Sequence, residues 1–434
     1  MKGINISLVS VLLFISCCVG IGKSQAASPI WATPELTVLI NEGLAGNKAL
    51  KSMALKAESL REMIPAQGAL PDPVLGLAVL NLPTDSFRFD EQPMTQKQIT
   101  VGQKFPWFGK LGLQSDKSAL IAERYELQVT AKQLELSKNI ADLYYSLGIV
   151  KEGLKTNDQL TELVAQIGQI AESRYSTGRG PQQDIFQAQV ELARLKDEEI
   201  RLKNRYQTLE LNLNRVLNRV RFIAIDAPAG LKELNLSLDR AKLTSFALTN
   251  NPQLQEKKIE KEIFKVDVHI ADKAYWPDVD VKLSYGQRDE DMTGKDLADF
   301  VSASVSIPIP IWQRTKQDKK RASAESALRS VENEYQNILE TLPFTIDSLV
   351  TEIEALQENY HIYKRTLIVQ ADQWARSSLA EYEVGKIEFN TMINAQLRLL
   401  KFDLQAETYL FNIYQKRAEL EEILGSSLDR QSIQ

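Results

Sequence analysis

The sequence has few of the residues on which most enzymes and metal sites depend. Its 434 residues include two cysteines, Cys17 and Cys18, and two histidines, His269 and His361. Thiolate metal sites, disulfide scaffolds and histidine-centred catalysis therefore lack their side chains. Glycine-rich phosphate loops, nucleophile elbows and clusters with metal-ligand spacing are also missing from the sequence. We therefore expect neither an enzyme nor a bound metal or cofactor.

Positive charge is not in surplus. Lys and Arg total 52 against 57 Asp and Glu, which gives a formal net charge of -5. A protein that binds a phosphate backbone needs an excess of cations, so we expect no nucleic-acid partner. Beyond the N-terminal segment, no stretch approaches the roughly 18 consecutive apolar residues of a membrane helix.

The first 26 residues have the features of a secretory signal peptide. Lys2 supplies a positive start, residues 4–21 are mostly apolar, and Ser24-Gln25-Ala26 offers a small-x-small cleavage site. Two alternatives stay open. The segment could remain as an uncleaved membrane anchor, or Cys17 could be lipidated after a sequence, Phe14-Ile15-Ser16, that loosely resembles a lipoprotein site.

The rest of the chain repeats itself at an offset of about 205 residues, as duplicated folds do. The matching segments are 47–50 and 251–254, 70–72 and 276–278, 105–110 and 309–314, and 175–178 and 382–385. We interpret residues 27–434 as one duplicated unit with a first repeat at about 35–218, a connector at about 219–250 and a second repeat at about 251–425.

Each half is predicted to contain a helix, two strands and a helical hairpin. Long polar segments at 112–175 and 315–382 are rich in strong helix formers, and we expect Pro343 to kink or interrupt the second. Apolar residues recur in heptads along the last part of each half, which is typical of coiled coils. The rows include Ile185, Ala188, Leu192, Leu195 and Leu213 in the first half, and Met392, Ala395, Ala406, Ile413 and Leu420 in the second.

Four short segments carry the alternation of apolar and polar residues that β-strands show. Residues 99–105, 279–285 and 301–309 alternate, whereas residues 74–82 are apolar on both faces. Strands of about ten residues, apolar on one face, suit a membrane β-barrel. Aromatic residues at the strand ends would form an interfacial belt; these are Trp107, Phe108, Trp276 and Trp312. A soluble hairpin in each half is the alternative.

A membrane sheet must close, because lipid cannot satisfy an open edge. Four strands are too few, since membrane barrels begin at about eight strands. Closure would therefore need several chains, and three copies would supply about twelve strands.

The duplicated order of elements resembles the TolC family of outer-membrane efflux proteins across essentially the whole mature chain. At the hairpin tips, an aromatic residue is followed three positions later by glycine, and in the first half by aspartate six positions after that. The residues are Arg174, Tyr175, Gly178 and Asp184 in the first half, and Tyr382, Gly385 and Thr391, in place of aspartate, in the second. The turn at 105–110 is similar to the family's Pro-x-x-Gly-Lys turn and to that of metal-efflux relatives.

The resemblance implies a mainly α fold with a small β part. Three copies would share one 12-stranded β-barrel in the outer membrane of a Gram-negative bacterium, and their coiled-coil hairpins would form an α-barrel through the periplasm. The hairpin tips would dock on a periplasmic adaptor, or membrane fusion protein, joined to an inner-membrane pump. The docking residues would be Arg174, Tyr175, Gly178, Asp184, Tyr382 and Gly385.

The implied activity is that of a passive exit duct. Family members often narrow the tunnel mouth with acidic side chains, but Thr391 and Asn394 occupy those positions here, with Glu388 nearby. The exported substrate stays open between drugs, metal ions and proteins. The alternative function is a periplasmic coiled-coil adaptor or scaffold that does not span lipid.

Overall fold

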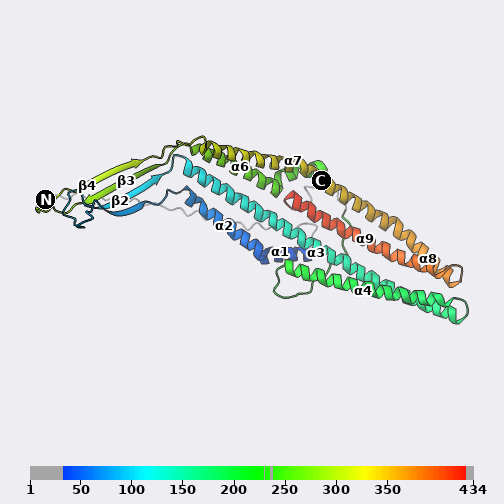
Figure 1. Cartoon of the computed structure of the whole chain (residues 1–434). Helices are drawn as coiled ribbons and strands as arrows, with labels where there is room; N and C mark the ends of the chain where they lie inside the picture. The colour runs from blue at the N-terminus through cyan, green and yellow to red at the C-terminus, as the bar shows by residue number, and fades with distance from the viewer. Residues whose placement is uncertain (1–32, 229, 235–237, 427–434) are drawn as a thin grey trace, which may run out of the picture.

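The protein is an elongated molecule with a small sheet at one end and two helical hairpins at the other (Figure 1). The structure, a computed structural model, describes residues 33–228, 230–234 and 238–426. The predicted signal peptide and Cys17 lie outside these residues. Among the helices in the described ranges, none is long and apolar enough to cross a membrane.

The two halves of the chain contain the same elements in the same order. The first half consists of α1 (Pro34–Gly46), α2 (Lys48–Gly68), β1 (Val74–Leu80), β2 (Gln96–Phe105), α3 (Lys110–Ser176) and α4 (Gln182–Val216). The second consists of α5 (Arg240–Asn250), α6 (Pro252–Lys273), β3 (Val279–Gln287), β4 (Phe300–Ser306), α7 (Gln317–Ile362), the π-helical turn η1 (Tyr363–Leu367), α8 (Ile368–Glu383) and α9 (Phe389–Leu424). With 67 residues, α3 is about 100 Å long.

Each half begins with a short helix that ends at an asparagine. Asn47 accepts a hydrogen bond from the Leu50 N–H at 2.9 Å, and Asn251 accepts one from the Leu254 N–H at 2.8 Å. Each asparagine therefore caps a new helix in a new direction. The sequence pattern did not predict α1 or α5 as separate helices, and α5 lies within the segment that we expected to be a connector.

The four strands form one antiparallel sheet in the order β1-β2-β3-β4. The pairing between β2 and β3 joins the two halves. The register aligns apolar residues across all four strands: one row is Leu77, Ile99, Tyr285 and Val301, and the next is Leu75, Val101, Leu283 and Ala303. These residues occupy alternate positions along each strand, so they share one face of the sheet.

The predicted heptad rows form the helical core. The described residues contain three apolar clusters, one in the middle of the molecule, one between α5, α6, α7 and α9, and one near the hairpin tips. Heptad positions that are buried include Ala188, Leu195 and Leu213 on α4, and Met392, Ala395, Ala406, Ile413 and Leu420 on α9.

The expected interruption at Pro343 is absent. Helix α7 continues through this proline to Ile362, and the irregular turn η1 comes about twenty residues later. The flanking residues Leu342 and Ile346 are buried in the apolar cluster with α5 and α9. We attribute the continuity to this packing, which offsets the loss of one backbone hydrogen bond at the proline.

Two glycines of α3 give a matched stability prediction. A Cβ at Gly148 would lie 2.6 Å from Cζ of the buried Phe411 and 2.9 Å from Cγ of Pro228. At Gly153 the nearest atom is 3.4 Å away, on the flexible Leu202 side chain. Overpacking should make Gly148→Ala less stable than the wild type by about 1–3 kcal/mol. Gly153→Ala should be neutral or up to about 1 kcal/mol more stable, because alanine favours helix. Denaturant unfolding of both variants tests this; equal stability would contradict the packing of α3 against α9.

Candidate functional site

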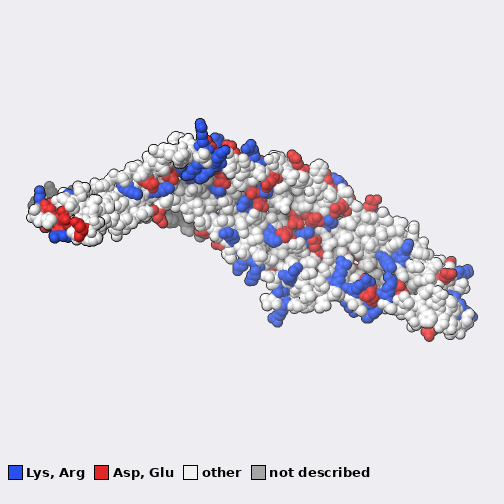
Figure 2. Space-filling model, in the orientation of Figure 1, with Lys and Arg blue, Asp and Glu red and all other residues white. Residues whose placement is uncertain are grey.

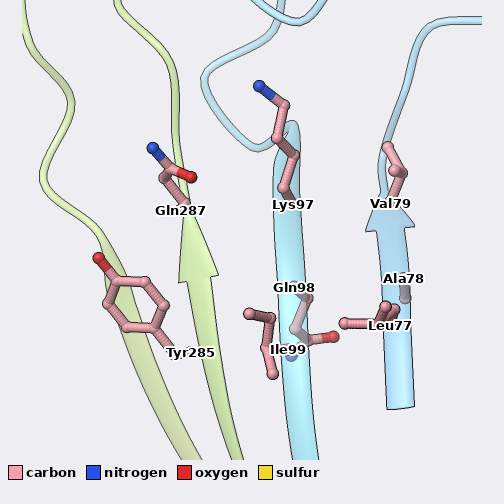
Figure 3. A pocket seen from close by; sticks show the side chains of 8 residues that line it. All are labelled: Leu77, Ala78, Val79, Lys97, Gln98, Ile99, Tyr285 and Gln287. Carbon is pink, nitrogen blue, oxygen red and sulfur yellow. The ribbon is translucent and has the colours of Figure 1, made fainter.

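The apolar face of the sheet is open to its surroundings. Leu77 is 75% exposed and Val301 is 72% exposed, although both would be expected in a core. Leu77, Ile99 and Tyr285, from three neighbouring strands, line an open hollow of about 340 Å³. Figure 3 shows these side chains on their strands. Figure 2 shows few charged side chains over the sheet between its outer loops and the helices. A contiguous exposed apolar surface of this kind marks contact with lipid or with another protein.

The opposite face of the sheet is mainly polar on β2, β3 and β4, whereas β1 is apolar on this face as well. The Thr100 and Ser284 hydroxyls are 2.9 Å apart across β2 and β3, and Lys282 lies opposite Ser304. The two faces therefore differ in polarity. In addition, β1 and β4 each have one strand neighbour in the described chain, so their outer edges carry backbone groups without ladder partners.

Aromatic side chains surround the end of the sheet that adjoins the helices. The Trp107 and Trp276 rings stack with centroids 5.0 Å apart, and Phe108 meets Trp107 edge-on at 5.8 Å. Trp276, Phe108 and Trp312 are all exposed. The predicted belt residues are therefore brought together at one level of the molecule.

The turn that follows β2 is fastened to the second half of the chain. Gly109 adopts a φ of +84° that glycine tolerates best. Lys110 Nζ lies 2.7 Å from Asp278 Oδ1, and the Trp107 N–H donates to the same oxygen at 3.0 Å. The glycine and lysine of this turn thus hold the two strand-to-helix junctions together, a role that the sequence motif did not reveal.

Both hairpin tips end their first helix in the same way. The Gly178 N–H donates to the Tyr175 carbonyl and the Arg179 N–H to the Arg174 carbonyl, at 3.0 and 2.7 Å. At the second tip, the Gly385 N–H donates to the Tyr382 carbonyl at 3.0 Å, and the Lys386 N–H donates to the Glu381 carbonyl at 2.8 Å. This pattern is the Schellman motif, which needs a left-handed residue. Gly178 and Gly385 supply it, with φ of +72° and +77°.

The two tips are joined by one tyrosine. Tyr382 on α8 is 1% exposed, and its hydroxyl donates to Asp184 Oδ2 on α4 at 2.9 Å. The Arg174 guanidinium lies 4.4 Å from the centre of the Tyr382 ring and also donates to the Tyr382 carbonyl. Burial raises the pKa of the Tyr382 phenol, and the hydrogen bond to Asp184 raises it further, so the phenol remains a donor. This contact lies within the apolar cluster shared by both hairpins, where Phe389 meets the Tyr382 ring edge-on.

The predicted docking residues thus divide into two groups. Tyr175, Gly178 and Gly385 are exposed at the ends of the hairpins, whereas Tyr382 contacts both Arg174 and Asp184 between the hairpins. The predicted mouth residues lie on an exposed face of α9. Glu388 is the N-cap of this helix, and Thr391 and Asn394 follow at intervals of three residues.

Among the residues that the structure describes, no group of three or more His, Cys, Asp or Glu side chains is arranged to hold a metal ion.

The comparison with protein families decides what this architecture is. The model of the outer membrane efflux protein family matches residues 39–219 and 243–426. The chain belongs to this family. The efflux protein is accordingly a protein of the bacterial outer membrane, in a family of transport channels.

Individual relatives of the efflux protein are distant in sequence. It is 20% identical over 404 residues to the cobalt-zinc-cadmium resistance protein CzcC of Cupriavidus metallidurans, covering 92% of this chain and 91% of that protein. It is 22% identical over 371 residues to the probable outer membrane lipoprotein SilC of Salmonella typhimurium, covering 82% and 78% of the two chains. The crystal structure of the outer membrane protein VceC from Vibrio cholerae has the same fold, with a TM-score of 0.76, 18% identity, and coverage of 91% of this chain and 97% of that one.

These comparisons confirm the predicted fold class, a mainly α protein with a small β part. The four-stranded sheet of the efflux protein fits a partial contribution to a trimeric barrel. They also favour the predicted outer-membrane efflux function over a periplasmic scaffold that does not span lipid.

Proposed function

We propose that three copies of the efflux protein close one 12-stranded barrel in the lipid of the outer membrane. The observation that carries this proposal is the exposed apolar face of a sheet with two open edges. Lipid would cover the face, and pairing between β1 of one copy and β4 of the next would satisfy both edges. The polar face, with its Ser, Thr and Lys side chains, would then line a water-filled interior, and the aromatic belt would lie at the membrane boundary.

The hairpins would continue this duct through the periplasm. The tips lie at the end of the molecule opposite the sheet (Figure 1), where they can meet an adaptor that is joined to an inner-membrane pump. Tyr175, Gly178 and Gly385 would face the adaptor because they are exposed, whereas Arg174, Asp184 and Tyr382 would hold the two tips together. Glu388, Thr391 and Asn394 would border the tunnel mouth. The protein would act as a passive conduit without catalytic residues, and the pump would supply the energy.

We also propose the organisation of the chain that its sequence predicts. Residues 1–26 would be a signal peptide, and residues 27–434 one duplicated unit with repeats at about 35–218 and 251–425. The match of the family model in two segments supports the duplication. Lipidation of Cys17 remains the alternative to cleavage after Ala26, and the description of SilC as a probable lipoprotein supports it.

Divalent metal cations are the proposed cargo. The support is the similarity to CzcC, whose name states resistance to cobalt, zinc and cadmium. Deleting the gene should make the host more sensitive to salts of these three metals, and the wild-type gene should restore growth. Sensitivity to an uncharged organic toxin, tested in parallel, should not change. Unchanged metal tolerance, in a strain whose wild type carries the protein in its outer membrane, would contradict metal export.

A further inference from the structure

The segment that follows β4 exposes several large apolar side chains. Residues 307–316 include Ile309 and Ile311, and also Trp312, which is 69% exposed. Pro308 and Pro310 have no N–H groups, so the segment cannot extend the strand as a full ladder partner. It therefore presents apolar side chains at the end of the sheet next to the helices.

A hollow of about 380 Å³ lies between this segment and the start of α7. Its lining includes the apolar residues Trp276, Ile309 and Trp312, and also Lys316, Gln317 and Lys320. Figure 2 shows Lys and Arg side chains gathered at the bend where the weakly charged sheet meets the helices. Apolar and cationic side chains thus line one hollow.

Two of the three lysines that line this hollow have no ion-pair partner in the described part of the chain. Lys316 and Lys320 form no ion pair there, whereas the adjacent Arg321 pairs with Asp272 at 3.0 Å. The acid that borders the hollow, Asp278, is already bound by Lys110. The positive end of the α7 dipole adds to the same potential.

The hollow therefore combines two cations that have no ion-pair partner in the described chain with the exposed apolar side chains of Ile309 and Trp312. This combination suits a ligand with an anionic head and an apolar tail.

We propose that this hollow binds an anionic phospholipid. Lys316 and Lys320 pair with the headgroup phosphate, and an acyl chain covers Ile309 and Trp312. A soluble phosphate would leave that apolar surface open, which is why a lipid fits better. The inference rests on the proposed membrane placement, because it puts the site at the level of the aromatic belt on the periplasmic side.

The test uses the full-length protein, extracted from membranes and exposed to an equimolar mixture of phosphatidylglycerol and phosphatidylcholine, with bound lipid counted by native mass spectrometry. The wild type should retain phosphatidylglycerol in preference. The variant Lys316→Gln/Lys320→Gln should retain about tenfold less of it, because two interfacial cations are lost. The control variant Lys319→Gln/Lys386→Gln loses the same amount of charge at positions outside the hollow. It should retain as much phosphatidylglycerol as the wild type does.

Three results would overturn the inference: equal retention of both lipids by the wild type, equal losses in the two double variants, or displacement of the lipid by free glycerol phosphate. A double variant that loses its oligomeric state with lipid binding unchanged would instead assign the hollow to a contact between copies. Wild-type protein that is absent from the outer membrane would contradict the proposed function itself, so the two failures are distinguishable.

Discussion

Replacing Leu283 by arginine is expected to remove the protein from the outer membrane. Leu283 lies in a central strand, within the apolar row that also contains Val101. If this face contacts lipid, an arginine there costs about 2–4 kcal/mol per chain near the membrane midplane, and a trimer incurs that cost three times. Outer-membrane fractions should then lack the oligomer, which gel electrophoresis of unheated samples measures. Export should be lost with it.

The control places the same charge on the other face. Ser302 is exposed on β4 and lies opposite Ser284, on the polar side of the sheet. Ser302→Arg should therefore assemble at wild-type levels, because its side chain would point into water. Normal assembly of Leu283→Arg, or equal loss of both variants, would show that the apolar face does not meet lipid.

Replacing Tyr382 by alanine is expected to separate the two hairpin tips. The change removes a buried ring, the hydrogen bond to Asp184 and the contact with Arg174. Truncation of a buried aromatic residue costs about 3–5 kcal/mol. That loss should fall on the tips, because the other apolar clusters are distant from Tyr382. Hydrogen exchange should become faster at the end of α8 and the start of α9, and metal tolerance should decline.

The repeat supplies the matched control for this experiment. Tyr175 occupies the position in the first tip that Tyr382 has in the second, but it is 47% exposed. Tyr175→Ala should change stability by less than about 0.5 kcal/mol, as most surface substitutions do. It could still weaken adaptor binding, which a pull-down would reveal. Similar hydrogen exchange in both alanine variants would contradict the assignment of Tyr382 as the residue that joins the tips.

The local pattern of apolar and polar residues in the sequence was sufficient to predict the long helices and the strands. The helix predicted at 112–175 is observed at Lys110–Ser176, and the strand predicted from Val279 begins at that residue. Both periodicities are short-range and strong, so few alternatives competed with them. The last strand was predicted to reach residue 309 but ends at Ser306, since Pro308 and Pro310 cannot donate to a ladder.

Contacts between the halves could not be predicted from local pattern. The sequence shows two similar tip motifs, but it does not show that Tyr382 is buried against Asp184, 198 residues away in the chain. The same limit applies to Lys110 and Asp278. Pro343 does not interrupt α7, because tertiary packing outweighs a local propensity there. The short helices before Asn47 and Asn251 were missed, although an asparagine ahead of a helical segment is a capping signal.

A disulfide across the predicted seam between copies tests the central claim most directly. Ala78 lies on β1 and Ser302, Ser304 and Ser306 lie on β4, at opposite edges of the sheet. Within one chain these edges are three strand spacings apart, about 14 Å, which is too far for a disulfide. Ala78→Cys combined with cysteine at each β4 position in turn should, for at least one pair, give covalent trimers in oxidised outer membranes. Single-cysteine variants should give none. If every pair stays monomeric, the copies do not share a barrel.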